Sequence, residues 1–187
     1  EEVLADAAQV IGLPNDTSDD ELQLAGSFLL TYGTSYHALK DRAAAKPGES
    51  LLVLGAGGGV GLAAVELGKR MGLRVIAAAS TEAKREAARS RGADEAIDYT
   101  TDDFRGQLKT LTNGRGVDIV YHCAATAYEG LSVFSPHMIT TNIVTATTGV
   151  ASAAVASKVR RLVLCSSMAR YGENQVPFTE DMTPRPQ

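Results

Sequence analysis

Cysteine and histidine are scarce in this sequence. Its 187 residues include two cysteines, Cys123 and Cys165, and three histidines, at positions 37, 122 and 137. Each cysteine stands in an apolar run typical of a strand, so we expect buried free thiols and no disulfide. Only the adjacent His122 and Cys123 have metal-site spacing, and we expect no metal site.

Basic residues are also fewer than acidic ones. The 18 Lys and Arg residues are scattered among 22 Asp and Glu, and a net charge of -4 argues against nucleic acid or an anionic membrane as partner. No unbroken apolar run reaches the roughly 18 residues of a membrane span. We expect a cytoplasmic protein without a signal peptide, and both chain ends to be cuts from a longer protein.

The composition is otherwise that of a soluble globular protein, with 44% hydrophobic and 21% charged residues. This length accommodates one well-buried α/β domain. We therefore predict a single domain over residues 1–187, with a helical lead-in over 1–48.

Helical spacing marks the lead-in. Apolar residues recur with that spacing from Val3 to Ile11, and the stretch 13–16 then breaks the pattern. Ser18, followed by three acidic residues, is typical of a helix N-cap. A second helical region is predicted after it.

From Glu49 onward, short apolar strands alternate with helices, as in a parallel sheet covered on both faces. The predicted strands are 51–54, 74–79, 95–99, 117–123 and 161–166. The predicted helices are 59–72, 81–91, 101–112 and 136–157, the last of them buried. The fold class is therefore α/β, a Rossmann-type doubly wound sheet in the order 3-2-1-4-5.

A glycine cluster at 55–61 directly follows the first of these strands and precedes a helix. Gly55, Gly58 and Gly61 fit a G-x-x-G-x-x-G frame, while Ala56, Gly58 and Gly61 fit the G-x-G-x-x-G frame with alanine first. Gly59 and Val60 lie within either frame. Missing side chains let the turn tighten and let backbone N–H groups approach a pyrophosphate, which the helix dipole favours. We predict a nicotinamide dinucleotide here; a glycine-rich turn without a ligand is the alternative.

The residues after the second strand indicate which dinucleotide binds. Ala79 and Ser80 stand where an acid would accept the ribose hydroxyls of NAD, and Lys84 and Arg85 suit the 2′-phosphate of NADP. We predict NADP(H) in preference to NAD(H), with Ser80 and Lys84 in the site. Glu82 is the counter-candidate, and Lys84 could instead belong to a solvated helix face.

The first part of the chain, to about residue 120, resembles the cofactor domain of the quinone oxidoreductases in the medium-chain dehydrogenase/reductase superfamily, which are similar to zinc-type alcohol dehydrogenases. Four motifs carry the resemblance in the order of that family: residues 30–39, 57–65, 92–99 and 114–118. The separate substrate domain of that family and the last strands of its cofactor domain are missing from this sequence.

From about Val117 the chain is similar to the extended short-chain dehydrogenases, which include NAD-dependent epimerases and dehydratases. The sequence of residues 122–125 matches the H-x-A-A motif at a strand end in that family, and residues 166–172 match its S-S-x-x-x-Y-G motif. The resemblance implies that Cys123, Ala124 and Ala125 border the cofactor and that Ser167 is the catalytic serine. The Y-x-x-x-K helix that completes this site in those enzymes does not follow, because the chain ends first. A serine at a strand end is otherwise a turn residue.

Two resemblances that meet near residues 118–122 predict a chimera, engineered or natural, of a quinone-oxidoreductase-like half (49–120) and an epimerase-like half (121–187). The leading hypothesis is an NADP(H)-binding module of oxidoreductase ancestry without a complete active site. A reductase or epimerase completed by a partner chain is the second, and a non-catalytic scaffold with a vestigial pocket is the third. A sheet that stops at its fifth strand also predicts a homodimer through the exposed edge.

Overall fold

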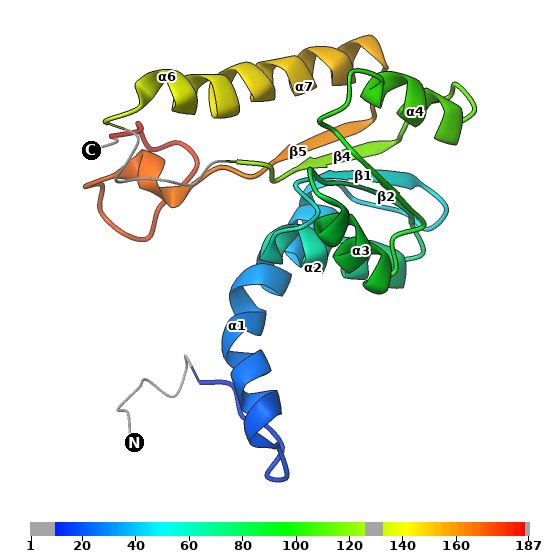
Figure 1. Ribbon diagram of the computed structural model, residues 1–187. Coiled ribbons are helices and arrows are strands. Elements are labelled where there is room, and N and C mark those ends of the chain that lie inside the picture. Colours follow the sequence, from blue (N-terminus) through cyan, green and yellow to red (C-terminus); the bar gives the residue numbers. More distant parts are fainter. Residues whose placement is uncertain (1–9, 126–132, 186–187) are drawn as a thin grey trace.

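Five short strands form one parallel sheet (Figure 1). The computed structural model describes residues 10–125 and 133–185. The strands are β1 (Ser50–Leu54), β2 (Arg74–Ala78), β3 (Glu95–Ile97), β4 (Ile119–His122) and β5 (Arg161–Leu164). Each lies within one or two residues of its predicted start and ends at or before its predicted end.

The strand order is β3-β2-β1-β4-β5, which confirms the predicted fold class. Leu51 of β1 pairs with Val75 of β2 on one side and with Ile119 of β4 on the other. The chain therefore winds outward in both directions from β1, and the carboxyl ends of β1 and β4 border the crevice at the topological switch point.

Helices cover both faces of the sheet, as the alternation of strands and helices predicts. They are α1 (Asp19–Tyr36), the π-helical η2 (His37–Arg42), α2 (Gly59–Arg70), α3 (Glu82–Ser90), α4 (Phe104–Leu111), α6 (Pro136–Ile139), the π-helical η3 (Thr140–Thr145), α7 (Ala146–Ala156) and the 3-10 turn η4 (Met168–Tyr171).

The core has two layers, one on each face of the sheet. Val53, Ala77 and Tyr121 belong to the layer that includes residues of α2 and α3. The neighbouring Leu52 and Val120 point to the other face, whose layer includes residues of α4 and α7. Alternate strand residues thus serve opposite layers, which is why the strands are apolar without interruption.

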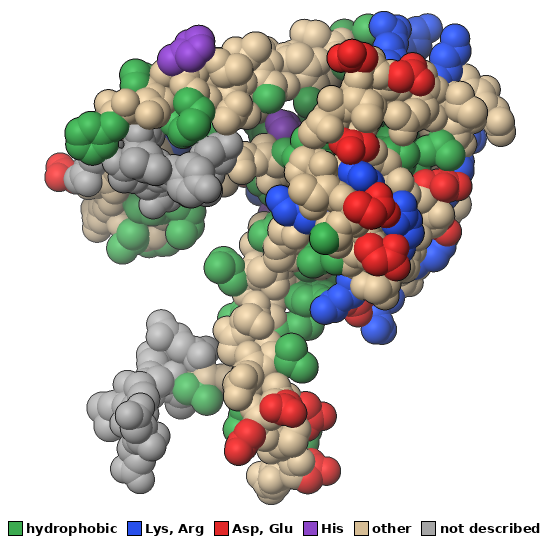
Figure 2. Space-filling view, viewed as in Figure 1, with side chains coloured by type: hydrophobic (Ala, Val, Ile, Leu, Met, Phe, Trp, Pro, Cys, Tyr) green, Lys and Arg blue, Asp and Glu red, His purple; other side chains and the backbone are tan. Residues whose placement is uncertain are grey.

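In its described part, residues 10–48, the lead-in contains one long α-helix, α1, and Ser18 is its N-cap, as predicted. The Ser18 hydroxyl accepts a bond from the Glu21 N–H (3.4 Å), and the Glu21 carboxylate accepts one from the Ser18 N–H (2.9 Å). The outer part of α1 extends away from the sheet (Figure 1), and hydrophobic side chains are exposed along it (Figure 2). Leu24 and Leu30 of α1 are 68% and 77% exposed.

The earlier helix predicted from Val3 to Ile11 falls mostly on residues 1–9, outside the described residues. Its described end, Val10 and Ile11, is not helical, so the prediction is wrong there. Glycine and proline follow at Gly12 and Pro14, and neither favours continuation of a helix.

The last long helix, Pro136–Ala156, was predicted to be buried, and this is wrong. Ala154 is buried, whereas Val144 and Val155 are 56% and 80% exposed. A helix of 21 residues is roughly 31 Å long, whereas the four-residue β5 spans about 13 Å. The helix therefore extends beyond the end of the sheet. By length and composition alone it could cross a membrane, although threonines interrupt its apolar residues.

Candidate functional site

The turn between β1 and α2 is tied to the neighbouring strands. The N–H groups of Gly55 and Ala56 both donate to the carbonyl of Ala78 at the end of β2 (3.2 and 3.1 Å). Gly55 has a φ of +88°, and a Cβ on it would lie 2.7 Å from the backbone nitrogen of Ala124. Glycine at 55 therefore supplies both a left-handed backbone angle and room for the segment that follows β4.

Gly61 and Gly58 have different roles. A Cβ on the buried Gly61 would overlap the carbonyl oxygen of Gly55, so glycine there lets α2 pack against the turn. Gly58, the N-cap of α2, has a φ of -94°, and the nearest atom to a Cβ on it would be 3.8 Å away. Internal packing does not require glycine at 58, and its missing side chain leaves the start of α2 open.

Backbone donors are concentrated at this open helix start. The N–H groups of Gly59, Val60 and Gly61 have no carbonyl four residues earlier in the helix, and the helix dipole favours an anion beside them. A Cβ on Gly59 would lie 3.3 Å from the Thr31 methyl group on α1. A side chain at Gly59 would therefore be directed toward α1.

A pocket of about 180 Å³ lies beside the turn, at the carboxyl ends of β1, β2 and β4. Gly58, Lys84, Cys123, Ala124 and Ala125, all predicted from sequence, line it. Ala56 is buried in the wall of the turn, Val60 lies in the first turn of α2, and Ser80 follows the lining residue Ala79. Five of the ten predicted cofactor residues thus line this pocket, whereas Gly59 lines the cavity between α1 and α2.

Lys84 extends across the glycine turn from α3. A Cβ on Gly57 would come within 2.5 Å of the Lys84 Cβ, so the lysine stem occupies the space that the missing side chain leaves. Within 10–125 and 133–185, no carboxylate forms an ion pair with Lys84. Its ammonium group is available to an anion in the pocket.

Arg85 has other partners. Its guanidinium pairs with Asp98 (2.8 Å) and Glu82 (2.9 Å) and donates to the Ala79 carbonyl (3.0 Å), and its side chain is 13% exposed. Arg85 therefore joins the ends of β2 and β3. Hydrogen bonds from Thr100 and the neighbouring Arg85 lower the pKa of Asp98, so this ion pair persists well into acid.

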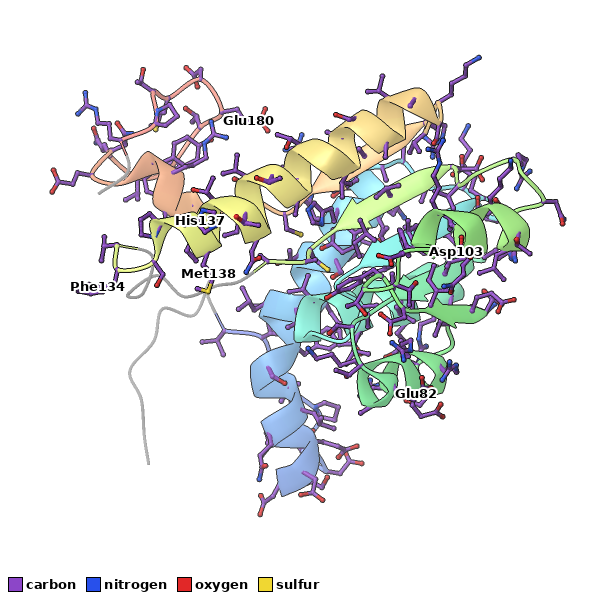
Figure 3. All side chains as sticks on the ribbon, turned by 45° about the horizontal axis from the view of Figure 1, so that its top comes forward. Glu82, Asp103, Phe134, His137, Met138 and Glu180 are labelled. Carbon is purple, nitrogen blue, oxygen red and sulfur yellow. The ribbon has the colours of Figure 1, made fainter. Side chains whose placement is uncertain are left out.

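Glu82, the counter-candidate for the ribose, belongs to the outer surface of α3 (Figure 3). It is exposed in the first turn of the helix, pairs with Arg85 and Arg89, and does not line the pocket. Hydrogen bonds from Arg89 and Arg85 lower its pKa. These contacts fit a helix-dipole and ion-pair role.

Tyr99 is a lining residue that was not predicted as part of the site. It follows β3, is 38% exposed and lines the pocket together with Lys84 and Ala79. An aromatic residue two positions after a strand is a weak signal in sequence, because nothing there places the end of β3 beside β2 and α3.

His122 and Cys123, the one pair with metal-site spacing, point to opposite faces of the sheet. The Cys123 thiol donates to the Leu54 carbonyl (3.2 Å) on the α2 face. The buried His122 ring has Nε2 3.3 Å from the Thr147 hydroxyl of α7, and among the described residues its Nδ1 has no hydrogen-bond partner. Burial lowers the pKa of His122, so the ring is neutral at pH 7.

The predicted burial of both cysteines is only partly right. Both are free thiols, but Cys123 is half-buried and Cys165 is exposed. Cys165 stands just beyond the edge strand β5, where no further strand covers it in the described ranges.

Ser167 lies past the end of β5, and its hydroxyl accepts a bond from the Ala169 N–H (3.1 Å) at the start of η4. Tyr171, the tyrosine in the same motif, stacks on Phe178 with ring centroids 5.1 Å apart. Neither residue lines the pocket beside the glycine turn. These contacts correspond to the turn role that was the alternative for Ser167.

A larger cavity of about 660 Å³ lies between α1 and α2. Its lining is mostly apolar, and its polar members satisfy one another: the Tyr32 hydroxyl donates to Glu66 (2.6 Å), which also pairs with Arg91 (3.1 Å). Gly59 of α2 lines this larger cavity. The smaller pocket combines Gly58 at the open helix start with the cation of Lys84, and is therefore the better candidate site for an anionic ligand.

A parallel sheet in the order 3-2-1-4-5, with a glycine turn and an open helix start at its switch point, defines a Rossmann-type domain of the dinucleotide-binding class. The zinc-binding dehydrogenase family matches residues 59–163, more than half of the chain. The chain belongs to this family.

Individual relatives agree with this assignment. The 2-haloacrylate reductase of a Burkholderia species is 37% identical over 121 residues, which cover 65% of this chain and 36% of the reductase. Mycobacterial Rv1454c complexed with NADPH is 33% identical with a TM-score of 0.57, over 65% of this chain and 37% of that one. The quinone oxidoreductase of Thermus thermophilus, also solved with NADPH, is 36% identical with a TM-score of 0.50, over 65% of this chain and 37% of that one. The chain spans a little over a third of the length of these relatives.

The name of the family refers to zinc, but the described residues do not fit a zinc site. No three His, Cys, Asp or Glu side chains gather in 10–125 and 133–185. A tetrahedral zinc site takes at least three such protein ligands.

Proposed function

We propose that this chain is an NADP(H)-binding module of oxidoreductase ancestry. One observation carries the proposal: the start of α2 is open at Gly58, and the unpaired Lys84 lies across the same turn. A side chain is missing there without a packing reason, and both backbone donors and a cation face the space it leaves.

Different residues of the chain bind different parts of the cofactor. The N–H groups of the first turn of α2 bind the pyrophosphate. Lys84 and Ser80 take the adenosine ribose, with Tyr99 beside the adenine, and the segment 123–125 borders the nicotinamide end. The bound cofactor supplies hydride transfer.

The preference for NADP(H) rests on the charges around the end of β2. No carboxylate within the described ranges is paired with Lys84, and Arg85 neutralises Asp98 and Glu82. A 2′-phosphate therefore meets the Lys84 cation beside carboxylates that are already paired. The two relatives solved with NADPH are consistent with this proposal.

Substrate chemistry is proposed to depend on parts outside this chain, because the chain spans little more than a third of its relatives. A reductase or epimerase in which a partner chain completes a site at Ser167 is the second candidate. Turnover of NADPH with a quinone or a nucleotide sugar would support it. A scaffold with a vestigial pocket is the third, and it predicts no dinucleotide binding.

We also propose that residues 1–187 form one domain with a junction between dissimilar halves near 118–122. A void supports this: a cavity of about 120 Å³ lies between α4, α7 and the sheet, where the two halves meet. Leu54, Phe104 and Val120 line it from the first half, and Val150 and Ala154 from the second. The zinc-binding dehydrogenase match runs through residue 163, so the short-chain likeness of the second half stays a prediction.

The homodimer remains a proposal as well. β5 is an edge strand on which Leu162 and Leu164 are 36% and 49% exposed, and residues 168–185 lie beyond its carboxyl end, not alongside it (Figure 1). An unpaired apolar edge favours pairing with a second copy.

Titration of the chain with NADPH and NADH tests the main proposal. Calorimetry or the change in nicotinamide fluorescence is expected to show one site per chain and tighter binding of NADPH. Absence of binding to both would instead support the scaffold.

A further inference from the structure

The two cysteines occupy neighbouring positions at one edge of the crevice. His122 pairs with Leu164 in the register of β4 and β5, and the Cys165 N–H donates to the His122 carbonyl (3.0 Å). The parallel ladder therefore continues by one residue, and Cys123 stands opposite Cys165. Register neighbours in a sheet lie about 4.8 Å apart, within the Cα separation that a disulfide spans.

The side chains share one face of the sheet. Strand alternation places Cys123 and Cys165 on the face of Tyr121, and the Cys165 thiol lies 3.2 Å from the Tyr121 hydroxyl. The Cys123 thiol donates to the Leu54 carbonyl on its other side (3.2 Å). A χ1 rotation of Cys123 away from β1 would turn its sulfur toward Cys165.

The two thiols differ in their exposure to solvent. Cys165 is exposed, whereas Cys123 is half-buried in the pocket wall. Burial and the neighbouring Cys165 raise the pKa of Cys123 to about 12. Cys165 is therefore the first thiol to react, and Cys123 is the one that resolves the product.

We propose that Cys123 and Cys165 are a redox-sensitive dithiol that closes to an intramolecular disulfide by exchange with a small-molecule disulfide such as oxidised glutathione. The Cys165 thiolate attacks one glutathione sulfur, and the first glutathione leaves as a thiolate. The Cys123 sulfur then attacks the Cys165 sulfur, and its proton passes to the second glutathione as that glutathione leaves. Two electrons pass from the protein to the glutathione disulfide, and the two cysteine protons end on the released thiols.

Oxidation has a consequence for the pocket that rests on the proposed function. Closing the disulfide removes the Cys123 thiol from the Leu54 carbonyl and draws the pocket wall toward β5. The adjoining Ala124 is in close contact with Gly55, so the wall has little freedom to move without shifting the turn. We expect the affinity for NADPH to fall at least threefold on oxidation.

The full chain is incubated in glutathione redox buffers, quenched with acid, alkylated and mapped by mass spectrometry. Both thiols of the unsubstituted chain are expected to disappear together, with the loss of two hydrogens and no retained glutathione. Cys123→Ser should instead retain one glutathione on Cys165. A chain that keeps glutathione on Cys165 beside a free Cys123, or a disulfide between two chains, would overturn the proposal.

A trivalent arsenical tests the spacing without oxidation. Phenylarsine oxide bridges two neighbouring thiols, so it should bind the reduced chain one to one and each of Cys123→Ser and Cys165→Ser at least tenfold more weakly. Equal binding to all three would contradict a dithiol. NADPH titration is separate: failure to bind NADPH in either redox state would refute the proposed function and leave the disulfide standing.

Discussion

The stem of Lys84 lies against Gly57, so close that a Cβ on Gly57 would be 2.5 Å from the Lys84 Cβ. This contact joins the first turn of α3 to the glycine turn after β1. The sequence separates the two residues by a helix and a strand, and the parallel pairing of β1 with β2 brings them together. Lys84 therefore stands beside both the glycine turn and Ala79 at the end of β2.

The first prediction concerns that cation. Lys84→Ala should weaken NADPH binding ten- to a hundredfold and leave NADH binding within about twofold, because a charge-assisted contact contributes about 1.5 to 3 kcal/mol. Calorimetric titration of both cofactors measures this. Lys109→Ala, an exposed lysine on α4, is the control and should change neither affinity. An equal loss for both cofactors would place Lys84 on the pyrophosphate.

A carboxylate at the start of α2 tests the anion site. Gly58→Asp should abolish dinucleotide binding through charge repulsion, yet keep or raise the melting temperature, since aspartate is a better N-cap than glycine. The control Gly26→Asp adds the same charge to an open position on α1. Unchanged affinity in Gly58→Asp would show that the phosphates bind elsewhere.

The buried His122 should make stability depend on pH. Its folded pKa is lowered by burial, so below the unfolded pKa of about 6.5 the unfolded chain binds more protons than the folded one. The resulting loss of stability is absent above that pH and grows as pH falls toward the folded pKa. Urea unfolding at several pH values should show a shallower acid loss for His122→Gln than for the parent. His137→Gln, at the exposed amino end of α6, should follow the parent curve (Figure 3).

The cavity between the two halves should accept a larger side chain. Ala154→Leu should raise the free energy of unfolding by about 0.5 to 2 kcal/mol, because it fills a void of about 120 Å³ lined with apolar residues. Ala156→Leu, on the same helix at an exposed position, controls for helix propensity. Destabilisation by Ala154→Leu alone would mean that the halves are already closely packed.

The edge of the sheet should control association. Light scattering should give a dimer mass for the parent chain and a monomer mass for Leu162→Lys, because a lysine on an edge strand opposes pairing. Thr100→Lys, beyond β3 near the other edge, should remain dimeric. A parent chain that stays monomeric at high concentration would refute the dimer.

Local patterns were sufficient for most elements. The apolar runs at 51–54 and 74–78 and the helical spacing of 59–70 each depend on a few consecutive residues, as does the Ser18 cap. The strand order followed because crossover helices leave few ways to wind a parallel sheet. Burial of the helix 136–156 was not predictable in this way, since it depends on how much sheet lies beneath it.

The sequence alone determined that a glycine turn joins a buried strand to a helix, because strand, turn and helix are contiguous and their chemistry is local. The tertiary structure decided which of the neighbouring basic residues is available to an anion. Asp98, which follows the next strand, forms an ion pair with Arg85, and the Lys84 ammonium group remains available. Tertiary structure also places Tyr99 in the pocket lining and Cys123 opposite Cys165. These relations join residues that are distant in sequence, and only the pairing of strands places them within contact.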